Sequence, residues 1–370
     1  MDWFGNRLRE QYIYKRVSWS DWTEHEAYGY ITSGSVELSA DSNLKVTGSF
    51  AFEGYEIPDT NDLVRVYYTF LDSKGERAME PIATFFVSYA NVSHTDTRAG
   101  IKSKGTLNGE SVLSVLEDTK YGQPYTVLRN TNMIYKAQEL VRELGLPVNF
   151  TPSTRAMTAD HTFAAGATYL EMVNWLCETA GYTDAYPDPY GTVQLQPYRD
   201  TELRSDSIIF RNDDRSIMYP EIEETNNIAN IPNVVRLLYN TDIACIRAEA
   251  RNVTGSRASL DARGGREKTY FEEIGELSAE GGRLASLMDL SEQKLREESC
   301  DVEYVTFSHA YVPVYIYDPV TVYYSDREWT GNADNISINL APATKTQMKI
   351  KRVLYDEIVV EKSGAVIRGE

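Results

Sequence analysis

Residues 62–88, DLVRVYYTFLDSKGERAMEPIATFFVS, hold two runs rich in aromatic and β-branched residues around the polar segment DSKGE. Such runs favour β-strands, and a Gly-containing polar segment between them has the composition of a hairpin turn. Residues 33–54 alternate apolar and polar positions, which is typical of strands with one buried face. We therefore predict a β section over residues 1–107, with one more short strand at residues 99–109.

The spacing of apolar residues becomes helical after this section. Residues 108–122 and 131–147 carry apolar residues three and four positions apart, as an amphipathic helix requires. In residues 160–182, DHTFAAGATYLEMVNWLCETAGY, Thr168 and Glu171 form a capping-box pattern, and a glycine follows the last apolar position. Three helices are thus expected in this part of the chain.

The rest of the chain returns to β patterns, with a fourth helix predicted at residues 279–298. A β, then helical, then β order predicts an α+β, β-rich fold with a helical lobe between two β domains. The predicted domains are residues 1–107, residues 108–200 together with 242–299, and residues 201–241 together with 300–370.

The composition excludes several classes of protein. The chain of 370 residues has a net charge of −18, which disfavours tight binding to nucleic acid because phosphate contacts need clustered Lys and Arg. No apolar run reaches the ~20 residues that span a bilayer, and the N-terminus lacks the apolar core of a signal peptide. The 26 tyrosines suit sheet surfaces and protein interfaces. The three cysteines are too far apart to predict a disulfide framework.

Cys177 and His161 invite a cysteine-nucleophile hypothesis. Cys177, however, falls on the same helical stripe as Leu170 and Val173, which is expected to face a core, and buried cysteine behaves as a small apolar residue. We therefore predict a structural role for Cys177.

No other pattern selects a chemical site. The four histidines are scattered, and Asp184 and Asp188 do not match a calcium loop. The segment ARGGRE at residues 262–267 resembles a phosphate motif only superficially, because no apolar strand precedes it. No catalytic, cofactor-binding or metal-ligating residue is assigned, although an incidental Ca²⁺ or Mg²⁺ site on the acidic surface stays open.

Three places, in this order along the chain, resemble the baseplate hub or tail-tip hub proteins of tailed bacteriophages and related contractile injection systems. They are residues 62–88, residues 163–198, and residues 230–240 followed by 309–326. The resemblance implies two tube-protein-like β-barrels with an α/β lobe inserted between and into them.

The same resemblance implies a structural, non-enzymatic role. A homotrimer with two barrels per chain would form a pseudo-sixfold ring that joins a sixfold tail tube to a threefold tip and lets DNA pass. The implied partners are further copies of the chain, a tail tube or distal tail protein above, a tip, spike or tail-fibre protein below, and the C-terminus of the tape-measure protein in the lumen. The implied location is the tail tip or baseplate of the virion, after assembly in the host cytoplasm, with neither sequence-specific nucleic-acid binding nor a membrane span.

Function in such a ring lies in surfaces. Tyr67, Tyr68, Tyr323 and Tyr324 are the interface anchors that we predict, with one member of each adjacent pair facing a partner because residues alternate across a strand. Two alternatives stay open, a tail-tip module that binds saccharide or another receptor, and a cell-wall hydrolase.

Overall fold

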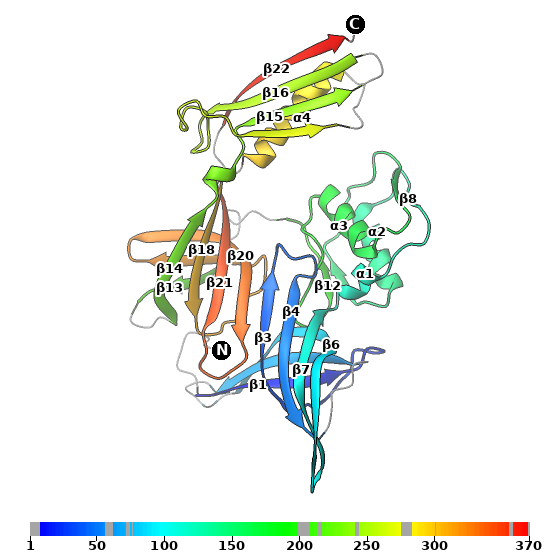
Figure 1. Cartoon of the computed structure of the whole chain (residues 1–370), viewed down its shortest axis with the longest axis vertical. Helices are drawn as coiled ribbons and strands as arrows, with labels where there is room; N and C mark the ends of the chain where they lie inside the picture. The colour runs from blue at the N-terminus through cyan, green and yellow to red at the C-terminus, as the bar shows by residue number, and fades with distance from the viewer. Residues whose placement is uncertain are drawn as a thin grey trace. The chain divides into compact units, whose positions relative to one another are not determined.

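The computed structural model describes residues 8–55, 62–71, 75, 77–198, 207–213, 217–240, 244–274, 283–299, 301–354 and 358–368. The chain divides into two compact units (Figure 1). Unit 1 comprises Met1–Ile222 and Thr306–Ile350, and unit 2 comprises Glu223–Val305 and Lys351–Glu370.

The first β section of unit 1 confirms the hairpin predicted from residues 62–88. Its strands are β1 (Leu8–Val17), β2 (Glu24–Ala27), β3 (Ile31–Ser39), β4 (Val46–Gly54), β5 (Leu63–Leu71), β6 (Arg77–Thr97) and β7 (Gly100–Ser111). Strand β5 pairs antiparallel with β6, from Leu63 opposite Phe86 to Leu71 opposite Arg77. Most of the turn, residues 72–74 and 76, lies outside the described residues.

The alternating residues of β3 and β4 face a core, as predicted. Val36, Leu38, Val46, Phe50 and Phe52 are each at most 3% exposed. Burying side chains of this size is worth roughly 1.5–3 kcal/mol each relative to exposure, so this face determines which side of each strand turns inward.

The second β section joins the first through one strand pair. Its strands are β13 (Ile208–Arg211), β14 (Met218–Asn226), β18 (Asp301–His309), β19 (Pro319–Tyr324), β20 (Arg327–Asn339) and β21 (Thr346–Leu354). The sheet runs β14-β18-β21-β20-β3-β4-β7-β6-β5-β1-β2, with β13 and β19 attached beside β20. Ile336 of β20 lies opposite Leu38 of β3 in the antiparallel pair that links the two sections.

The helical lobe follows β7 within unit 1. Its elements are α1 (Ser114–Asp118), β8 (Tyr125–Val127), α2 (Met133–Glu143), β9 (Val148–Phe150), β10 (His161–Phe163), α3 (Tyr169–Thr179), β11 (Tyr186–Pro187) and β12 (Val193–Leu195). The three predicted helices are therefore present. Thr168 accepts a hydrogen bond from the backbone N–H of Glu171 at 3.0 Å, and Gly181 after the helix has φ +75°, so α3 begins and ends where the sequence predicts.

Unit 2 has a sheet and a helix of its own. Strands β17 (Thr269–Glu273), β15 (Val234–Asn240), β16 (Ala244–Thr254) and β22 (Val359–Arg368) form a sheet in that order, preceded by the short 3-10 helix η2 (Ile228–Asn230). Helix α4 (Arg283–Glu298) packs on one face, where Leu287 and Leu295 join the core of the sheet. A Cβ at Gly364 would lie 2.8 Å from Leu284, so the glycine of β22 lets the helix approach closely.

These two units divide the chain differently from the predicted domains. Residues 108–200 belong to unit 1, whereas residues 242–299 belong to unit 2, so the two segments do not form a common lobe. Strands β15 and β22 were assigned by their sequence to the second β domain, yet they pair with β16 in the sheet of unit 2. The physical reason is that α4 carries its own apolar stripe, which these strands bury.

Candidate functional site

Cys177 and His161 do not form a nucleophilic pair in the structure. Cys177 is fully buried in the core of the lobe, and burial, with a smaller contribution from Asp184, raises the pKa of its thiol to about 12. His161 stacks its ring on Trp175, with ring centroids 3.8 Å apart. Among the described residues, no group of three or more His, Cys, Asp or Glu side chains could hold a metal ion. The predicted structural role of Cys177 agrees with this placement.

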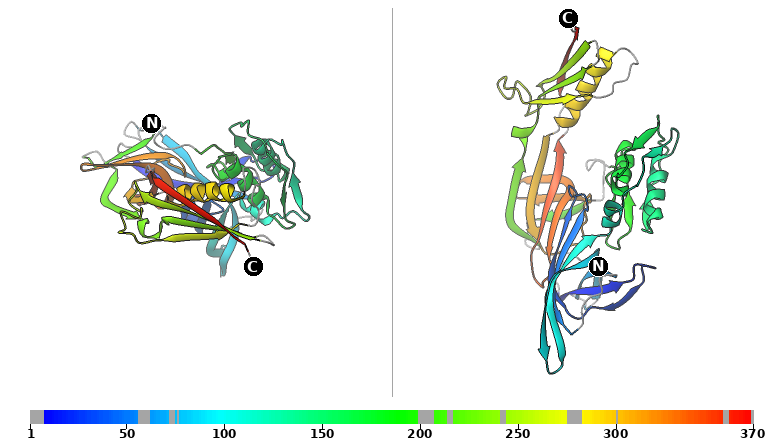
Figure 2. Two further views of the ribbon diagram at one scale, coloured as in Figure 1. Left: turned by 90° about the horizontal axis from the view of Figure 1, so that it is seen from above. Right: turned by 45° about the vertical axis from the view of Figure 1, so that its right-hand side comes forward.

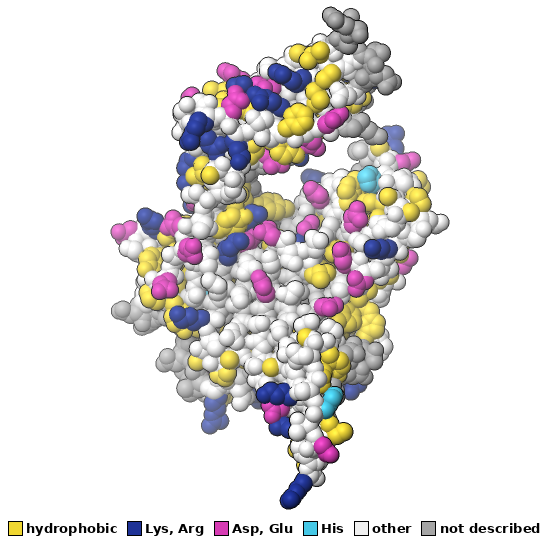
Figure 3. Space-filling view, viewed as in Figure 1, with side chains coloured by type: hydrophobic (Ala, Val, Ile, Leu, Met, Phe, Trp, Pro, Cys, Tyr) yellow, Lys and Arg dark blue, Asp and Glu magenta, His cyan; other side chains and the backbone are white. Residues whose placement is uncertain are grey.

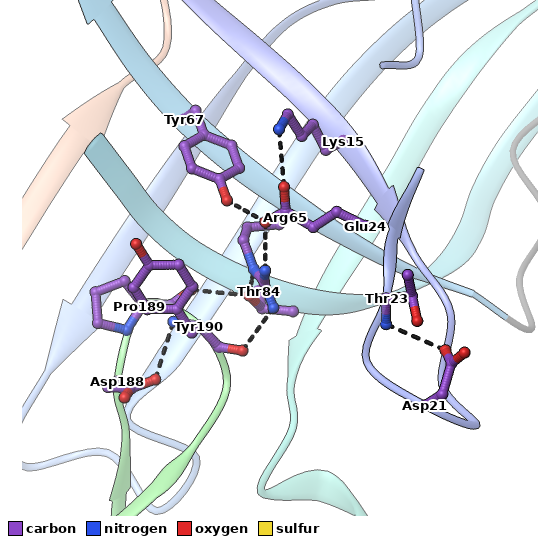
Figure 4. Close-up of polar contacts among 10 residues, drawn as sticks. All are labelled: Lys15, Asp21, Thr23, Glu24, Arg65, Tyr67, Thr84, Asp188, Pro189 and Tyr190. Atoms are coloured by element: carbon purple, nitrogen blue, oxygen red, sulfur yellow. Dashed lines mark hydrogen bonds and ion pairs between the residues drawn. The ribbon is translucent and has the colours of Figure 1, made fainter. Parts of the chain in front are cut away.

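Arg65 is a 5% exposed cation on β5 with a hydrogen bond from each of its three guanidinium nitrogens. Its Nε donates to the hydroxyl of Thr84 at 2.9 Å, and its Nη1 donates to Glu24 at 2.5 Å (Figure 4). Its Nη2 donates to the carbonyl of Tyr190 at 2.8 Å. Thr84 in turn donates to the carbonyl of Pro189 at 2.8 Å. One buried guanidinium thus ties the loop before β12 to the sheet.

Glu24 is the counter-ion of Arg65. Lys15 donates to its second carboxylate oxygen at 2.8 Å, and the hydroxyl of Tyr67 donates to the oxygen that also accepts from Arg65. Burial by itself would raise the pKa of the carboxyl, but the hydrogen bonds from Lys15, Tyr67 and Arg65 outweigh burial and lower the pKa to about 2. The carboxylate is therefore held ionised.

Asp188 organises the loop that Arg65 contacts. Its Oδ1 accepts from the backbone N–H groups of Tyr190 and Thr192, both at 2.9 Å, and its Oδ2 accepts from Gln194 at 3.0 Å. Burial is the largest influence on the carboxyl and raises its pKa, against the hydrogen bonds that lower it. Asp188 is therefore a turn-forming residue in this structure.

Two further contacts hold the same segment. Gly191 has φ +84°, and a Cβ there would lie 2.6 Å from the ring of Trp22. Lys45, 2% exposed, donates to Asp184 at 2.9 Å and to the carbonyl of Ala40 at 2.7 Å. The acidic loop at Asp184 and Asp188 thus attaches the lobe to the sheet.

Tyr67 and Tyr68 are both buried, at 5% and 1% exposed. Strand β5 lies between β1 and β6, and both of its faces are covered. The hydroxyl of Tyr68 donates to Glu10 at 2.8 Å, and its ring lies 4.6 Å from that of Tyr311.

Tyr323 and Tyr324 lie at the end of β19 and are half-buried. Tyr323 donates to Glu328 at 3.1 Å, and the guanidinium of Arg211 lies 4.1 Å from its ring centroid. Tyr324 donates to the carbonyl of Pro220 at 2.7 Å. Their role as interface anchors stays a prediction.

The sequence reasoning missed the length of the ribbon formed by β6 and β7, which extends beyond the other strands of unit 1 (Figures 1 and 2). Within the described residues, β6 pairs with β5 only as far as Phe86, whereas its pairing with β7 continues to Thr97 opposite Gly100. Tyr89 is 41% and Ile101 61% exposed. On the face drawn in Figure 3, the outer part of the ribbon carries scattered charged side chains of both signs beside hydrophobic ones. The β-branched and polar residues before Arg98 were the available signal.

Two of the hollows in the described part of unit 1 are lined by several tyrosines. The larger, about 410 Å³, lies beside Glu10, Tyr12, Tyr68 and Tyr311. The smaller, about 240 Å³, lies between the segment after β12 and the turn before β19. It is lined by Tyr186, Gln196, Tyr198, Tyr317, Asp318 and Asn332, among others.

Solved structures of other proteins share this architecture. The 43 kDa tail protein of prophage MuSo2 from Shewanella oneidensis matches with a TM-score of 0.61 and 13% identity, over 93% of this chain and 98% of that one. The tail protein from Neisseria meningitidis MC58 matches with a TM-score of 0.61 and 12% identity, over 93% and 97%. The chain has the fold of phage tail proteins.

A third solved structure shares this fold. A chain of the Francisella PdpA-VgrG complex is similar with a TM-score of 0.55 and 9% identity, over 95% of this chain and 59% of that one. The resemblance to the hub family is thus confirmed at the level of the fold. No protein-family model matches the sequence, and no curated protein sequence matches it either. None of the described helices is long and apolar enough to cross a membrane.

Proposed function

We propose that this chain is a structural protein of a phage tail, a baseplate or tail-tip hub without enzymatic activity. Three copies would form a pseudo-sixfold ring that adapts the sixfold tail tube to the threefold tip or spike and lets DNA pass. The observation that carries the proposal is the fold likeness to the prophage MuSo2 tail protein and to the Neisseria meningitidis tail protein, over nearly the full length of all three chains.

The arrangement of the two β sections supports two ring-forming modules per chain. Each section contributes several antiparallel strands, and the β20–β3 pair joins them in one sheet. Two similar modules in each of three copies would give six positions around a closed ring. The helical lobe, fixed to the sheet by Arg65, would then be repeated three times.

The exposed surfaces of unit 1 support assembly with other copies and with neighbouring tail proteins. The outer part of β6 has backbone groups that a strand from another copy could pair with. Tyr323 and Tyr324 would add half-buried aromatic surface to such an interface. A tube or distal tail protein above and a tip, spike or fibre protein below are the partners that this role requires, and the virion tail is its location. The net charge of −18 would favour a lumen to which DNA phosphates do not adhere.

The test is the mass of the purified chain in solution, followed by electron microscopy of tails assembled with and without it. We expect a mass three times that of one chain, alone or after addition of the tube protein, and a ring of density at the tail tip that is absent without the chain. A chain that stays monomeric with the tube protein and never enters a tail would refute the proposal.

A further inference from the structure

The smaller hollow of unit 1 has the composition of a ligand site. Two tyrosine rings form one wall, where Tyr186 and Tyr317 lie 5.1 Å apart at an interplanar angle of 60°. Tyr198, 48% exposed, lines the same hollow with one part of its ring in solvent. The amide of Gln196 and the carboxylate of Asp318 also line the hollow. Concave sites with aromatic walls and a few convergent polar groups are where small ligands bind.

Tyr317 is held in a backbone conformation that costs energy. Its φ is +70°, which a bulky residue rarely adopts. The turn maintains it through bonds on both sides, because the N–H of Tyr317 donates to the carbonyl of Ala333 at 2.9 Å and the N–H of Tyr315 donates to Asp318 at 2.9 Å. Such strain, on the order of 1–3 kcal/mol, concentrates at ligand sites where the surrounding structure enforces it.

Asn332, across the hollow, contributes a second and independent sign. Its Oδ1 is a buried oxygen for which the described residues provide no hydrogen-bond donor. A buried acceptor without a donor costs roughly 1–3 kcal/mol, so a ligand donor that reaches this oxygen after a small rotation of the Asn332 amide would be stabilising. Gln196 donates to Gln194 at 3.3 Å and accepts from Thr151 at 2.5 Å, which leaves one of its two amide N–H bonds for a ligand.

The charges around the hollow select the class of ligand. Neither Lys nor Arg is among the described residues that line it, so these residues offer an anionic ligand such as a phosphate no counter-ion. A single carboxylate does not make a metal site. Amides, a carboxylate and tyrosine rings instead match the hydroxyls and the apolar ring face of a sugar. A volume of about 240 Å³ is smaller than a drug-sized pocket and suits one sugar ring.

We propose that this hollow binds one residue of a neutral saccharide, with the sugar ring against Tyr198 and its hydroxyls on Gln196, Asp318 and Asn332. The bound sugar supplies the missing donor to Asn332 and uses the strained placement of Tyr317 as part of the wall. The inference is independent of the ring, since a single copy of unit 1 holds all of these residues.

Ligand-observed saturation-transfer NMR on the full chain tests this proposal. The probes are the methyl glycosides of glucose, galactose, mannose, rhamnose and N-acetylglucosamine at millimolar concentration. The variants are Tyr198→Ala and Asn332→Ala, and Tyr135→Ala is the matched control because Tyr135 is 50% exposed on α2 and does not line the hollow. We expect saturation transfer to at least one glycoside, with roughly tenfold weaker binding in Tyr198→Ala and unchanged binding in the control.

The outcomes separate the explanations. Absence of transfer to every glycoside of the panel overturns the proposal, even if the hollow is then found to receive a side chain of a partner protein. Transfer that survives unchanged in Tyr198→Ala places the sugar elsewhere and also overturns it. Tyr198 is largely exposed, so its variant stays informative if Asn332→Ala does not fold. A monomeric chain that binds the glycoside would contradict the proposed hub and not this site.

Discussion

Each unit contains a network of arginine and glutamate, and the two networks differ in burial. In unit 1, Arg65 is 5% exposed and bonds groups from three separate segments of the chain (Figure 4). In unit 2, Glu249 and Glu267 accept from Arg236 and Arg251 at 2.6–2.9 Å on the sheet face away from α4, with both arginines about one third exposed.

The two networks therefore differ in what they contribute to stability. A buried guanidinium has no water to replace a lost partner, so its removal leaves unsatisfied groups in the interior. In unit 2 the two arginines are about one third exposed, so water can replace a lost bond even though Glu249 itself is buried, and each ion pair adds little. The unit 1 network therefore holds the helical lobe on the sheet. The unit 2 network lies on the surface of a sheet that is already stabilised by the apolar core under α4.

Arg65→Met should have the largest effect. Removing the guanidinium leaves Glu24 without its main buried partner and the carbonyl of Tyr190 without a donor, so the free energy of unfolding should fall by about 4 kcal/mol. Urea unfolding measures this loss. Arg236→Met is the control and should cost less than about 1 kcal/mol; equal losses would remove the contrast between the networks.

Lowering the pH should weaken the interaction of Glu24 with Arg65. The pKa of Glu24 is lowered from 4.5 to about 2, so its contribution is fully present above pH 4.5 and is lost as the pH falls through about 2. The contribution is at most about 3 kcal/mol. Urea unfolding across this range should show a steeper loss for the native chain than for Glu24→Gln, and parallel curves would show that the carboxylate is not held ionised by the fold.

Gly191→Ala should come next. The alanine would need φ +84° and would place its Cβ 2.6 Å from Trp22, so we expect a loss of about 2 kcal/mol and a change in tryptophan fluorescence. Gly122→Ala has open space around it and should change the stability by less than about 0.5 kcal/mol. A Gly191→Ala variant as stable as the control would mean that the loop can move off the sheet.

Glu267→Gln should have the smallest effect. Its carboxylate is 34% exposed and bonds two arginines that Glu249 also holds, so the loss should be about 0.5 kcal/mol and should vanish at high salt. Thermal unfolding at low and high salt checks both statements. A loss comparable to that of Arg65→Met would place the unit 2 network among the buried ones.

Local patterns predicted the elements well. The cap at Thr168, the burial of Cys177 and the β5–β6 hairpin all follow from residues close together in the chain. The partners of Arg65 could not be predicted this way, because Glu24 and Tyr190 lie 41 and 125 positions away. The burial of both Tyr67 and Tyr68 was missed for a similar reason, since alternation says which face a residue takes and not whether both faces are covered.

The β-rich class, the positions of the helices and the residues that face each core could be read from the sequence. Apolar residues recur with the period of a helix or a strand, so their spacing shows both the element and its buried face. The pairing of β20 with β3 and the packing of α4 on β15, β16 and β22 became visible in the folded chain alone. The same is true of the hollow, whose tyrosines are distant in the sequence. Strand edges pair through backbone groups that every residue shares, so the side-chain pattern specifies an inward face and leaves the choice of neighbour to the packing of the whole chain.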